Sequence, residues 1–161
     1  MPQRTHILIA VDIGNSRIKL GLFERGVDSA ELPVPLETLE LPLAHPAGEF
    51  EEKSLARWCE TCIAGDALWR ISSVHRGATE RFIAAAAAAK LAGHEWTLRQ
   101  IAHREVPMTA EVDYPDRVGM DRLLAALAAN RLRVPDRAAV VVDLGTAIKV
   151  DLVTAGGAFA G

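Results

Sequence analysis

The sequence lacks the features of a nucleic-acid-binding or membrane protein. Its 161 residues carry 18 Lys and Arg against 21 Asp and Glu, a net charge of −3, so no surplus of positive charge is present to neutralise a nucleic-acid backbone. The apolar run near the start, ILIAV from Ile7 to Val11, is too short for a membrane span or a signal-peptide core. We therefore expect a cytoplasmic globular protein without nucleic-acid or membrane partners.

Cysteine is also scarce, since Cys59 and Cys62 are the only two and form a single CxxC motif. A redox CxxC stands at the start of a helix that follows a strand, where the helix dipole lowers the pKa of the thiol. Here the preceding residues, EEKSLAR, are typical of a helix, so both thiols fall late in that helix. We interpret them as packed or surface thiols, and a measured thiol pKa near that of free cysteine would exclude redox chemistry.

Apolar residues make up 50% of the chain, enough to bury a core of ordinary size. Alternation and apolar runs predict strands at 6–13, 16–23, 27–32, 67–74, 95–102, 139–144 and 148–153, and helices at 51–63, 78–91 and 119–132. Four prolines mark an irregular connection before the first helix, namely Pro33, Pro35, Pro42 and Pro46. Gly93 is the expected stop of the second helix.

The predicted order βββ-α-β-α-β-α, followed by a new ββ start, describes an α/β protein with a mixed central sheet of the ribonuclease H-like type. The chain leaves the last long helix near Val134 to Asp136. We therefore expect a first domain over residues 1–135 and the start of a second, similar domain over residues 136–161.

A motif in the first strand pair recurs in the last. VDIGNSRIKLGLFERG at 11–26 and VDLGTAIKVDLVTAGG at 142–157 align with an offset of 131, which matches Asp12 with Asp143 and Gly14 with Gly145. Glycine in such a turn lets backbone N–H groups approach a phosphate, because it has no Cβ. An aspartate at the end of the preceding strand can hold Mg²⁺ through water.

A single D-x-G turn also occurs in ordinary hairpins, where its residues merely tolerate unusual backbone angles. The repetition favours a nucleotide clamp, similar to that of the actin-like ATPases and sugar kinases, in which Asp12 and Asp143 face one cleft. A Walker A loop is absent from the sequence, which excludes a P-loop nucleotide site.

Three motifs together resemble those of the type III pantothenate kinases, members of the actin-like ATPase superfamily. They are D-x-G-N-[ST]-x-x-K at 12–19, G-x-D-R at 119–122, and D-x-G-T-A with a later Asp at 143–151. SSV at 72–74 is also similar to a middle strand of that family. The resemblance covers the whole chain and implies transfer of the γ-phosphoryl group of ATP to the primary hydroxyl of pantothenate, the first step of coenzyme A biosynthesis.

The resemblance also implies the ligands of ATP and of the ions. Asp12 would organise Mg²⁺, and Asp143 would help to place a monovalent cation, K⁺ or NH₄⁺. The residues implied to contact the ATP phosphates are Gly14, Asn15, Ser16, Lys19, Gly145 and Thr146. Taken alone, a lysine such as Lys19 is more often a solvent-facing strand residue.

For pantothenate, the resemblance implies that Asp121 is the catalytic base that accepts the hydroxyl proton. Arg122 would pair with the pantothenate carboxylate, and Gly119, Met120 and Tyr114 would line the pocket. Without the resemblance, Asp121 and Arg122 also fit a helix-start carboxylate followed by a solvated arginine. His75, His94 and His103 show no ligand spacing and are interpreted as surface or packing residues.

The sequence departs from the family pattern at Lys149, where the family usually has threonine. This lysine either alters the second phosphate turn or points to solvent. The chain also ends at GGAFAG, before the rest of the family's second domain, so we expect an incomplete second domain and leave open whether these 161 residues are active alone.

The family further implies a homodimer formed through the helix after G-x-D-R. In this chain Leu123, Leu124, Leu127 and the intervening alanines make that helix apolar over more than one face. The alternative function is that of a non-catalytic relative acting as an accessory regulator of transcription. The presence of Asp121 argues against that alternative.

Overall fold

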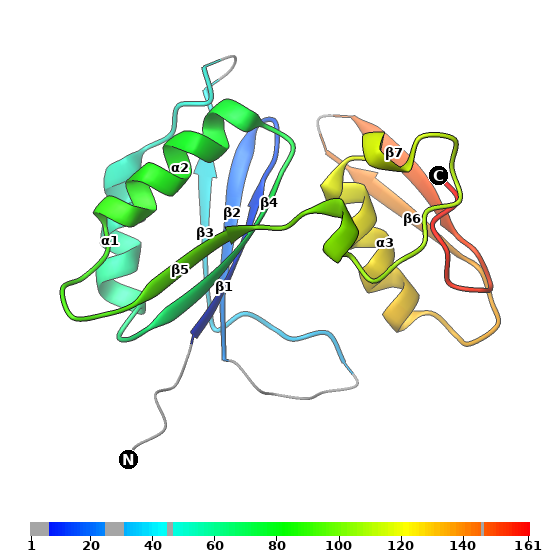
Figure 1. Cartoon of the computed structure of the whole chain (residues 1–161), viewed down its shortest axis with the longest axis horizontal. Helices are drawn as coiled ribbons and strands as arrows, with labels where there is room; N and C mark the ends of the chain where they lie inside the picture. The colour runs from blue at the N-terminus through cyan, green and yellow to red at the C-terminus, as the bar shows by residue number, and fades with distance from the viewer. Residues whose placement is uncertain (1–6, 25–30, 45–46, 146) are drawn as a thin grey trace. The chain divides into compact units, whose positions relative to one another are not determined.

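The computed structural model describes residues 7–24, 31–44, 47–145 and 147–161, and Figure 1 shows the chain as a ribbon. Contacts divide the chain after Gln100 into two compact units. No helix in the described ranges has the length and apolar character needed to cross a bilayer.

The first unit is built on a five-stranded mixed sheet (Figure 1). Strands β1 (Ile7–Ile13), β2 (Arg17–Glu24) and β3 (Glu37–Pro42) form an antiparallel meander. Strand β4 (Ala67–Ser73) runs parallel to β1, and β5 (Trp96–Gln100) runs parallel to β4. The order across the sheet is β3-β2-β1-β4-β5, which confirms the predicted α/β fold with a mixed central sheet.

Helices α1 (Glu52–Cys62) and α2 (Arg76–Ala88) lie next to each other on one face of this sheet (Figure 1). Alternate residues of a strand point to opposite faces, and in β1 the buried residues Ile9, Val11 and Ile13 join the core with Leu55 and Phe82 of the helices. Asp12 lies between Val11 and Ile13 and is exposed. The strand alternation therefore directs Asp12 to the face opposite α1 and α2.

The third strand was predicted in the wrong place. The prediction was 27–32, of which residues 27–30 lie outside the described residues, whereas the strand that pairs with β2 is Glu37–Pro42. That stretch had been expected to be irregular because of its prolines. Within β3, proline stands only at the last position, and β3 is an edge strand, where a missing N–H donor interrupts no central ladder.

The other predicted helices and strands are confirmed with small shifts at their ends. Helix α2 begins two residues earlier than predicted, because the ring Nδ1 of His75 accepts a hydrogen bond from the Ala78 N–H at 3.2 Å and caps the helix. The helix ends at Ala88, before Gly93, which has a φ of 86°.

In the second unit, helix α3 (Met120–Leu132) packs on a two-stranded antiparallel ribbon, β6 (Ala139–Leu144) and β7 (Ile148–Val153). Two short 3₁₀ helices, η1 (His103–Glu105) and η2 (Pro115–Arg117), precede α3. Leu123, Ala126, Val153 and Phe159 are buried together between these elements. Contacts thus group α3 with the ribbon, whereas we expected it to end the first domain; the domain limits 1–135 and 136–161 stay a prediction.

The ribbon has one apolar face and one face that carries charged residues. The cross-strand pairs Val140–Leu152, Val142–Val150 and Leu144–Ile148 form the apolar face, and their side chains are 39–75% exposed. The pairs Val141–Asp151 and Asp143–Lys149 alternate with them and belong to the other face, together with Ala139 and Val153, which join the core with α3. The charged residues of the ribbon are therefore placed on the same side as α3.

Candidate active site

Three polar residues lie side by side on neighbouring strands of the first sheet, close to the turn between β1 and β2. Asp12 is paired in register with Lys19 on β2 and with Ser72 on β4, so their side chains share the face opposite the helices. The Gly14 N–H donates a hydrogen bond to the Arg17 carbonyl oxygen at 3.0 Å. A Cβ on Gly14 would lie 3.3 Å from that same oxygen, so the turn is tight at this position.

Ser72 had not been assigned to the site, although SSV had been noted as a strand. Its side chain is only 4% exposed, and among the described residues its Oγ has no hydrogen-bond partner. A buried hydroxyl in register with Asp12, together with the exposed Asn15 and Ser16 of the turn, suits a ligand rich in oxygen atoms. The donor set fits a largely hydrated Mg²⁺, which uses one or two carboxylates plus substrate phosphates.

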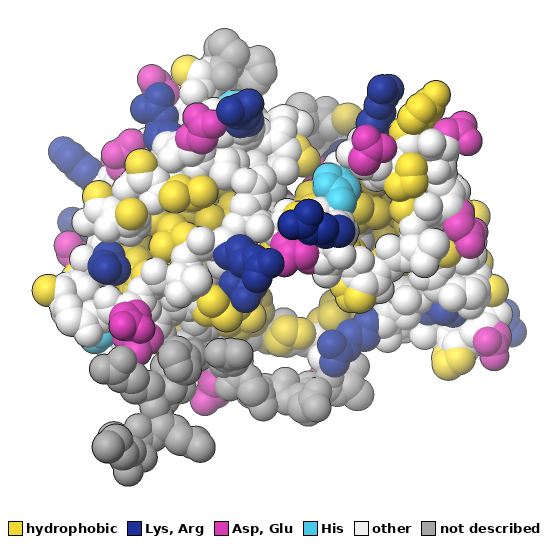
Figure 2. Space-filling model, viewed as in Figure 1, with side chains coloured by type: hydrophobic (Ala, Val, Ile, Leu, Met, Phe, Trp, Pro, Cys, Tyr) yellow, Lys and Arg dark blue, Asp and Glu magenta, His cyan; other side chains and the backbone are white. Residues whose placement is uncertain are grey.

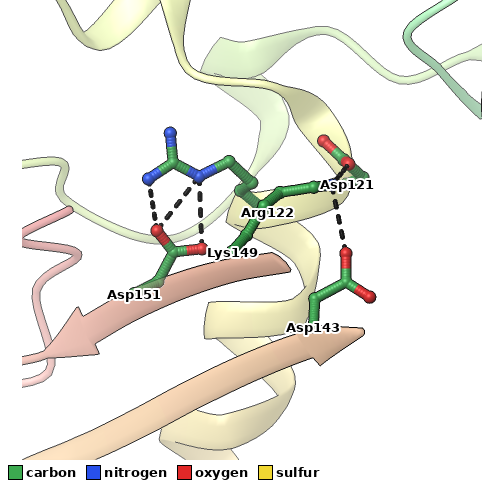
Figure 3. Close-up of polar contacts among 5 residues, drawn as sticks. All are labelled: Asp121, Arg122, Asp143, Lys149 and Asp151. Carbon is green, nitrogen blue, oxygen red and sulfur yellow. Dashed lines mark hydrogen bonds and ion pairs between the residues drawn. The ribbon is translucent and has the colours of Figure 1, made fainter. Parts of the chain in front are cut away.

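In the second unit, five charged residues form a compact group, which we call the charge cluster: Asp121, Arg122, Asp143, Lys149 and Asp151 (Figure 3). The Lys149 Nζ lies 2.5 Å from the Asp121 Oδ2 and 3.0 Å from the Asp143 Oδ2. Asp121 is in the first turn of α3, Asp143 near the end of β6, and Lys149 near the start of β7. The fold therefore brings together two of the three predicted motifs.

Arg122 is held by Asp151, the later aspartate of the third motif. Its Nε donates to the Asp151 Oδ1 at 3.0 Å, and its Nη2 forms an ion pair with the same oxygen. The Asp151 side chain is 3% exposed, and the guanidinium also lies over the Phe159 ring, 5.4 Å from its centroid. The interpretation of Arg122 as a solvated arginine is therefore wrong.

The two D-x-G turns differ by one residue. Ile13 pairs with Ile18 across four turn residues, and Leu144 pairs with Ile148 across three. As a result Asp12 faces Lys19 in the first hairpin and Asp143 faces Lys149 in the second. The ungapped alignment of the repeat hid this match; a single gap in the turn, comparing DIGNSRIK with DLGTAIK, would have found it.

Lys149 does not simply point to solvent, since its side chain is 30% exposed and binds two carboxylates. Hydrogen bonds to Asp121 and then to Asp143 raise the pKa of the Lys149 ammonium above its usual range. The hydrogen bond to Asp151 likewise raises the pKa of the Arg122 guanidinium. Both groups are therefore cations throughout the physiological pH range, and they offset most of the charge of the three carboxylates.

The other residues predicted for the site lie in several different surroundings. Gly119 is the N-cap residue of α3, and the Met120 side chain is buried in the core of the second unit. Tyr114 is exposed, with the Arg117 guanidinium over its ring at 4.7 Å. Gly145 is in the second turn, and Thr146 lies outside the described residues. That Asp12 and Asp143 face one cleft stays a prediction, since they belong to different units.

The CxxC motif does not have the environment of a redox site. Burial raises the pKa of the Cys59 thiol to about 12, and burial also raises the pKa of Cys62. A thiol with a raised pKa is mostly protonated at neutral pH and reacts slowly. This supports the interpretation of Cys59 as a packing residue of α1.

Comparison with known proteins gives the same family as the motifs. A family model described as type III pantothenate kinase matches residues 8–161. The chain belongs to the type III pantothenate kinase family. Curated relatives named type III pantothenate kinase include one from Nitratidesulfovibrio vulgaris, 30% identical over 157 residues, and one from Methylibium petroleiphilum, 33% identical over 162 residues. A third, from Rhodopirellula baltica, is 40% identical over 92 residues.

This member of the type III pantothenate kinase family spans about half the length of the relatives it matches. The alignments cover 91% of this chain and 53% of the Nitratidesulfovibrio vulgaris protein, and 96% and 58% for the Methylibium petroleiphilum protein. For the Rhodopirellula baltica protein the shares are 57% and 32%. The region that the family model matches, residues 8–161, includes both D-x-G turns and the charge cluster.

Proposed function

We propose that the protein containing this chain is a cytoplasmic kinase that transfers the γ-phosphoryl group of ATP to the primary hydroxyl of pantothenate, in coenzyme A biosynthesis. The observation that carries this proposal is the match of the type III pantothenate kinase model over residues 8–161. Figure 2 shows acidic and basic side chains interspersed, whereas a nucleic-acid backbone is typically bound by a surface rich in positive charge.

We assign ATP binding to the two D-x-G turns. Asp12 would hold Mg²⁺, which would supply positive charge to offset the negative charge of the ATP phosphates. Asn15, Ser16 and Lys19 would contact the phosphates from the first turn, and Thr146 would contact them from the second. Gly14 and Gly145 would let the backbone of the two turns approach the phosphates. The register of Lys19 opposite Asp12 supports this assignment, because it places both residues on the same face of the sheet, next to the turn.

We assign the acceptor side to the charge cluster. The Asp121 Oδ2 accepts a hydrogen bond from Lys149, whereas its Oδ1 accepts none from the described residues. Oδ1 would therefore take the proton of the pantothenate hydroxyl. The new O–P bond forms as the bond between the γ-phosphorus and the ADP oxygen breaks. The Arg122 Nη1 is turned away from Asp151 (Figure 3). We assign this nitrogen to the pantothenate carboxylate, with Gly119 and Tyr114 beside it. The Met120 side chain is buried in the core, so Met120 would contribute by fixing the start of α3 and not by lining the pocket.

The full-length protein, incubated with Mg²⁺-ATP and pantothenate, should release ADP and form phosphopantothenate. Product identity is checked by mass spectrometry, and ADP release by a coupled assay without pantothenate as the blank. Binding of ATP without any phosphorylation of pantothenate would contradict the proposal and favour the regulator of transcription.

We further propose that the full-length protein is a homodimer formed through α3. The side of α3 away from Leu123 and Ala126 carries half-exposed alanines such as Ala125 and Ala128, which allow close helix packing. Ala128→Arg should convert the dimer to a monomer in sedimentation velocity, because a buried guanidinium without a partner opposes association.

Ala84→Arg is the matched control for this experiment, since Ala84 is exposed on α2. It should leave the sedimentation coefficient unchanged. A wild-type protein that stays monomeric at high concentration would contradict the dimer.

A further inference from the structure

The ammonium of Lys149 lies between two carboxylates that come from different elements of the fold (Figure 3). It is 2.5 Å from the Asp121 Oδ2 and 3.0 Å from the Asp143 Oδ2. Two carboxylates that share one ammonium repel each other, and solvent screens this repulsion only in part because the Asp121 side chain is 25% exposed and that of Asp143 is 52% exposed. A cation between them therefore stabilises the start of α3 next to the end of β6.

The family resemblance places a monovalent cation at Asp143, and the residues of this chain do not fit one. The Asp143 Oδ2 is already paired with Lys149, so K⁺ or NH₄⁺ on this carboxylate would bring a second positive charge beside the first. Lysine carries the same charge as these ions and is tethered to β7. It therefore needs no loss of free translational entropy to occupy the position.

We propose that the Lys149 side chain is a built-in monovalent cation that links Asp121 and Asp143, so that this protein needs no K⁺ or NH₄⁺ at the charge cluster. The threonine usual at this position in the family has no charge and leaves such a position to an ion. The part of the proposal that concerns cation binding is independent of the proposed kinase function. The consequence for catalysis rests on that function.

Thermal unfolding tests cation binding without ATP or pantothenate. The wild-type chain, Lys149→Thr and Lys149→Met are compared in KCl and in choline chloride at equal ionic strength, so that general screening is the same. All three tryptophans, Trp58, Trp69 and Trp96, lie in the first unit, so unfolding of the second unit is followed by circular dichroism. Lys90→Thr, an exposed lysine after α2, is the matched control.

The wild type and Lys90→Thr should melt at the same temperature in both salts, within about 1 °C. Lys149→Thr and Lys149→Met should be less stable in choline chloride and should regain about 3 °C or more in KCl, in a saturable manner, because K⁺ then binds the two carboxylates. A K⁺-specific stabilisation of the wild type equal to that of the variants would overturn the proposal. So would the absence of K⁺-specific stabilisation in both Lys149 variants.

The full-length enzyme gives the second readout. Wild-type phosphorylation of pantothenate should be equal in KCl and choline chloride, whereas Lys149→Thr should be at least about tenfold faster in KCl. A K⁺ requirement of the wild-type enzyme would overturn the proposal. Complete inactivity of the wild type in both salts would contradict the proposed kinase function. It would not contradict the proposal on cation binding, which the melting experiment tests independently.

Discussion

Asp121→Asn in the full-length protein is expected to lower the rate of pantothenate phosphorylation by roughly two to four orders of magnitude, the usual scale for a positioned general base. Asparagine has nearly the same size and shape but cannot accept the hydroxyl proton. Affinity for Mg²⁺-ATP should change little, because Asp121 is in the first turn of α3 and in neither D-x-G turn. The measurement is kcat and KM for both substrates.

The contacts of Asp121 explain why the effect should be on kcat. Lys149 holds Oδ2 at 2.5 Å and so fixes the direction of the carboxylate, which leaves Oδ1 as the oxygen for the acceptor hydroxyl. An amide at this position keeps one oxygen for Lys149 and presents an NH₂ group to the hydroxyl. An interaction made mainly in the transition state is then lost, which lowers kcat and kcat/KM together.

Two variants serve as controls for this result. Asp116→Asn removes an exposed carboxylate of η2, close in sequence to the G-x-D-R motif, and should have wild-type kinetics. Asp12→Asn should have the opposite effect: it should mainly weaken the binding of Mg²⁺-ATP and should affect pantothenate less. Turnover by Asp121→Asn at the wild-type rate would show that the base has been assigned to the wrong residue.

The sequence predicted the order of helices and strands because apolar alternation and helix periodicity depend on local residues. It failed at β3, where prolines outweighed the alternation in the prediction, although an edge strand tolerates a proline at its end. The pairing of strands across the sheet followed from the predicted ribonuclease H-like fold and not from periodicity. The limits of the two compact units depend on packing between distant segments, which no local pattern specifies.

The site was predictable as a set of residues and not as a set of contacts. Asp121, Arg122 and Asp143 were all selected from motifs, but the partners Lys149 and Asp151 were noted only as a departure and as a later Asp. Their roles depend on the one-residue shorter turn between β6 and β7, which sets Lys149 opposite Asp143. They also depend on the packing of α3 on the ribbon, which brings residues 28 and 29 positions apart into contact.

Arg122→Met is expected to destabilise the second unit, whatever role Arg122 has toward substrate. Asp151 is 3% exposed, and loss of its guanidinium partner would leave a buried carboxylate unpaired, which typically costs about 3–5 kcal/mol. Because the Arg122 side chain is 34% exposed, solvent already screens part of the ion pair, and we expect about 2–3 kcal/mol. Hydrogen exchange of the α3 and ribbon amides measures this change in opening free energy.

Replacing both partners separates the ion pair from a role in substrate binding. Arg122→Met with Asp151→Leu should regain most of the lost stability, since no buried charge is left without a partner. Arg104→Met, an exposed arginine of η1 in the same unit, should leave the exchange rates unchanged, and tryptophan fluorescence should show an unaltered first unit in every variant. Equal stability of Arg122→Met and wild type would mean that the ion pair with Asp151 contributes little to the stability of the second unit. The role of Arg122 would then be chiefly to bind the pantothenate carboxylate.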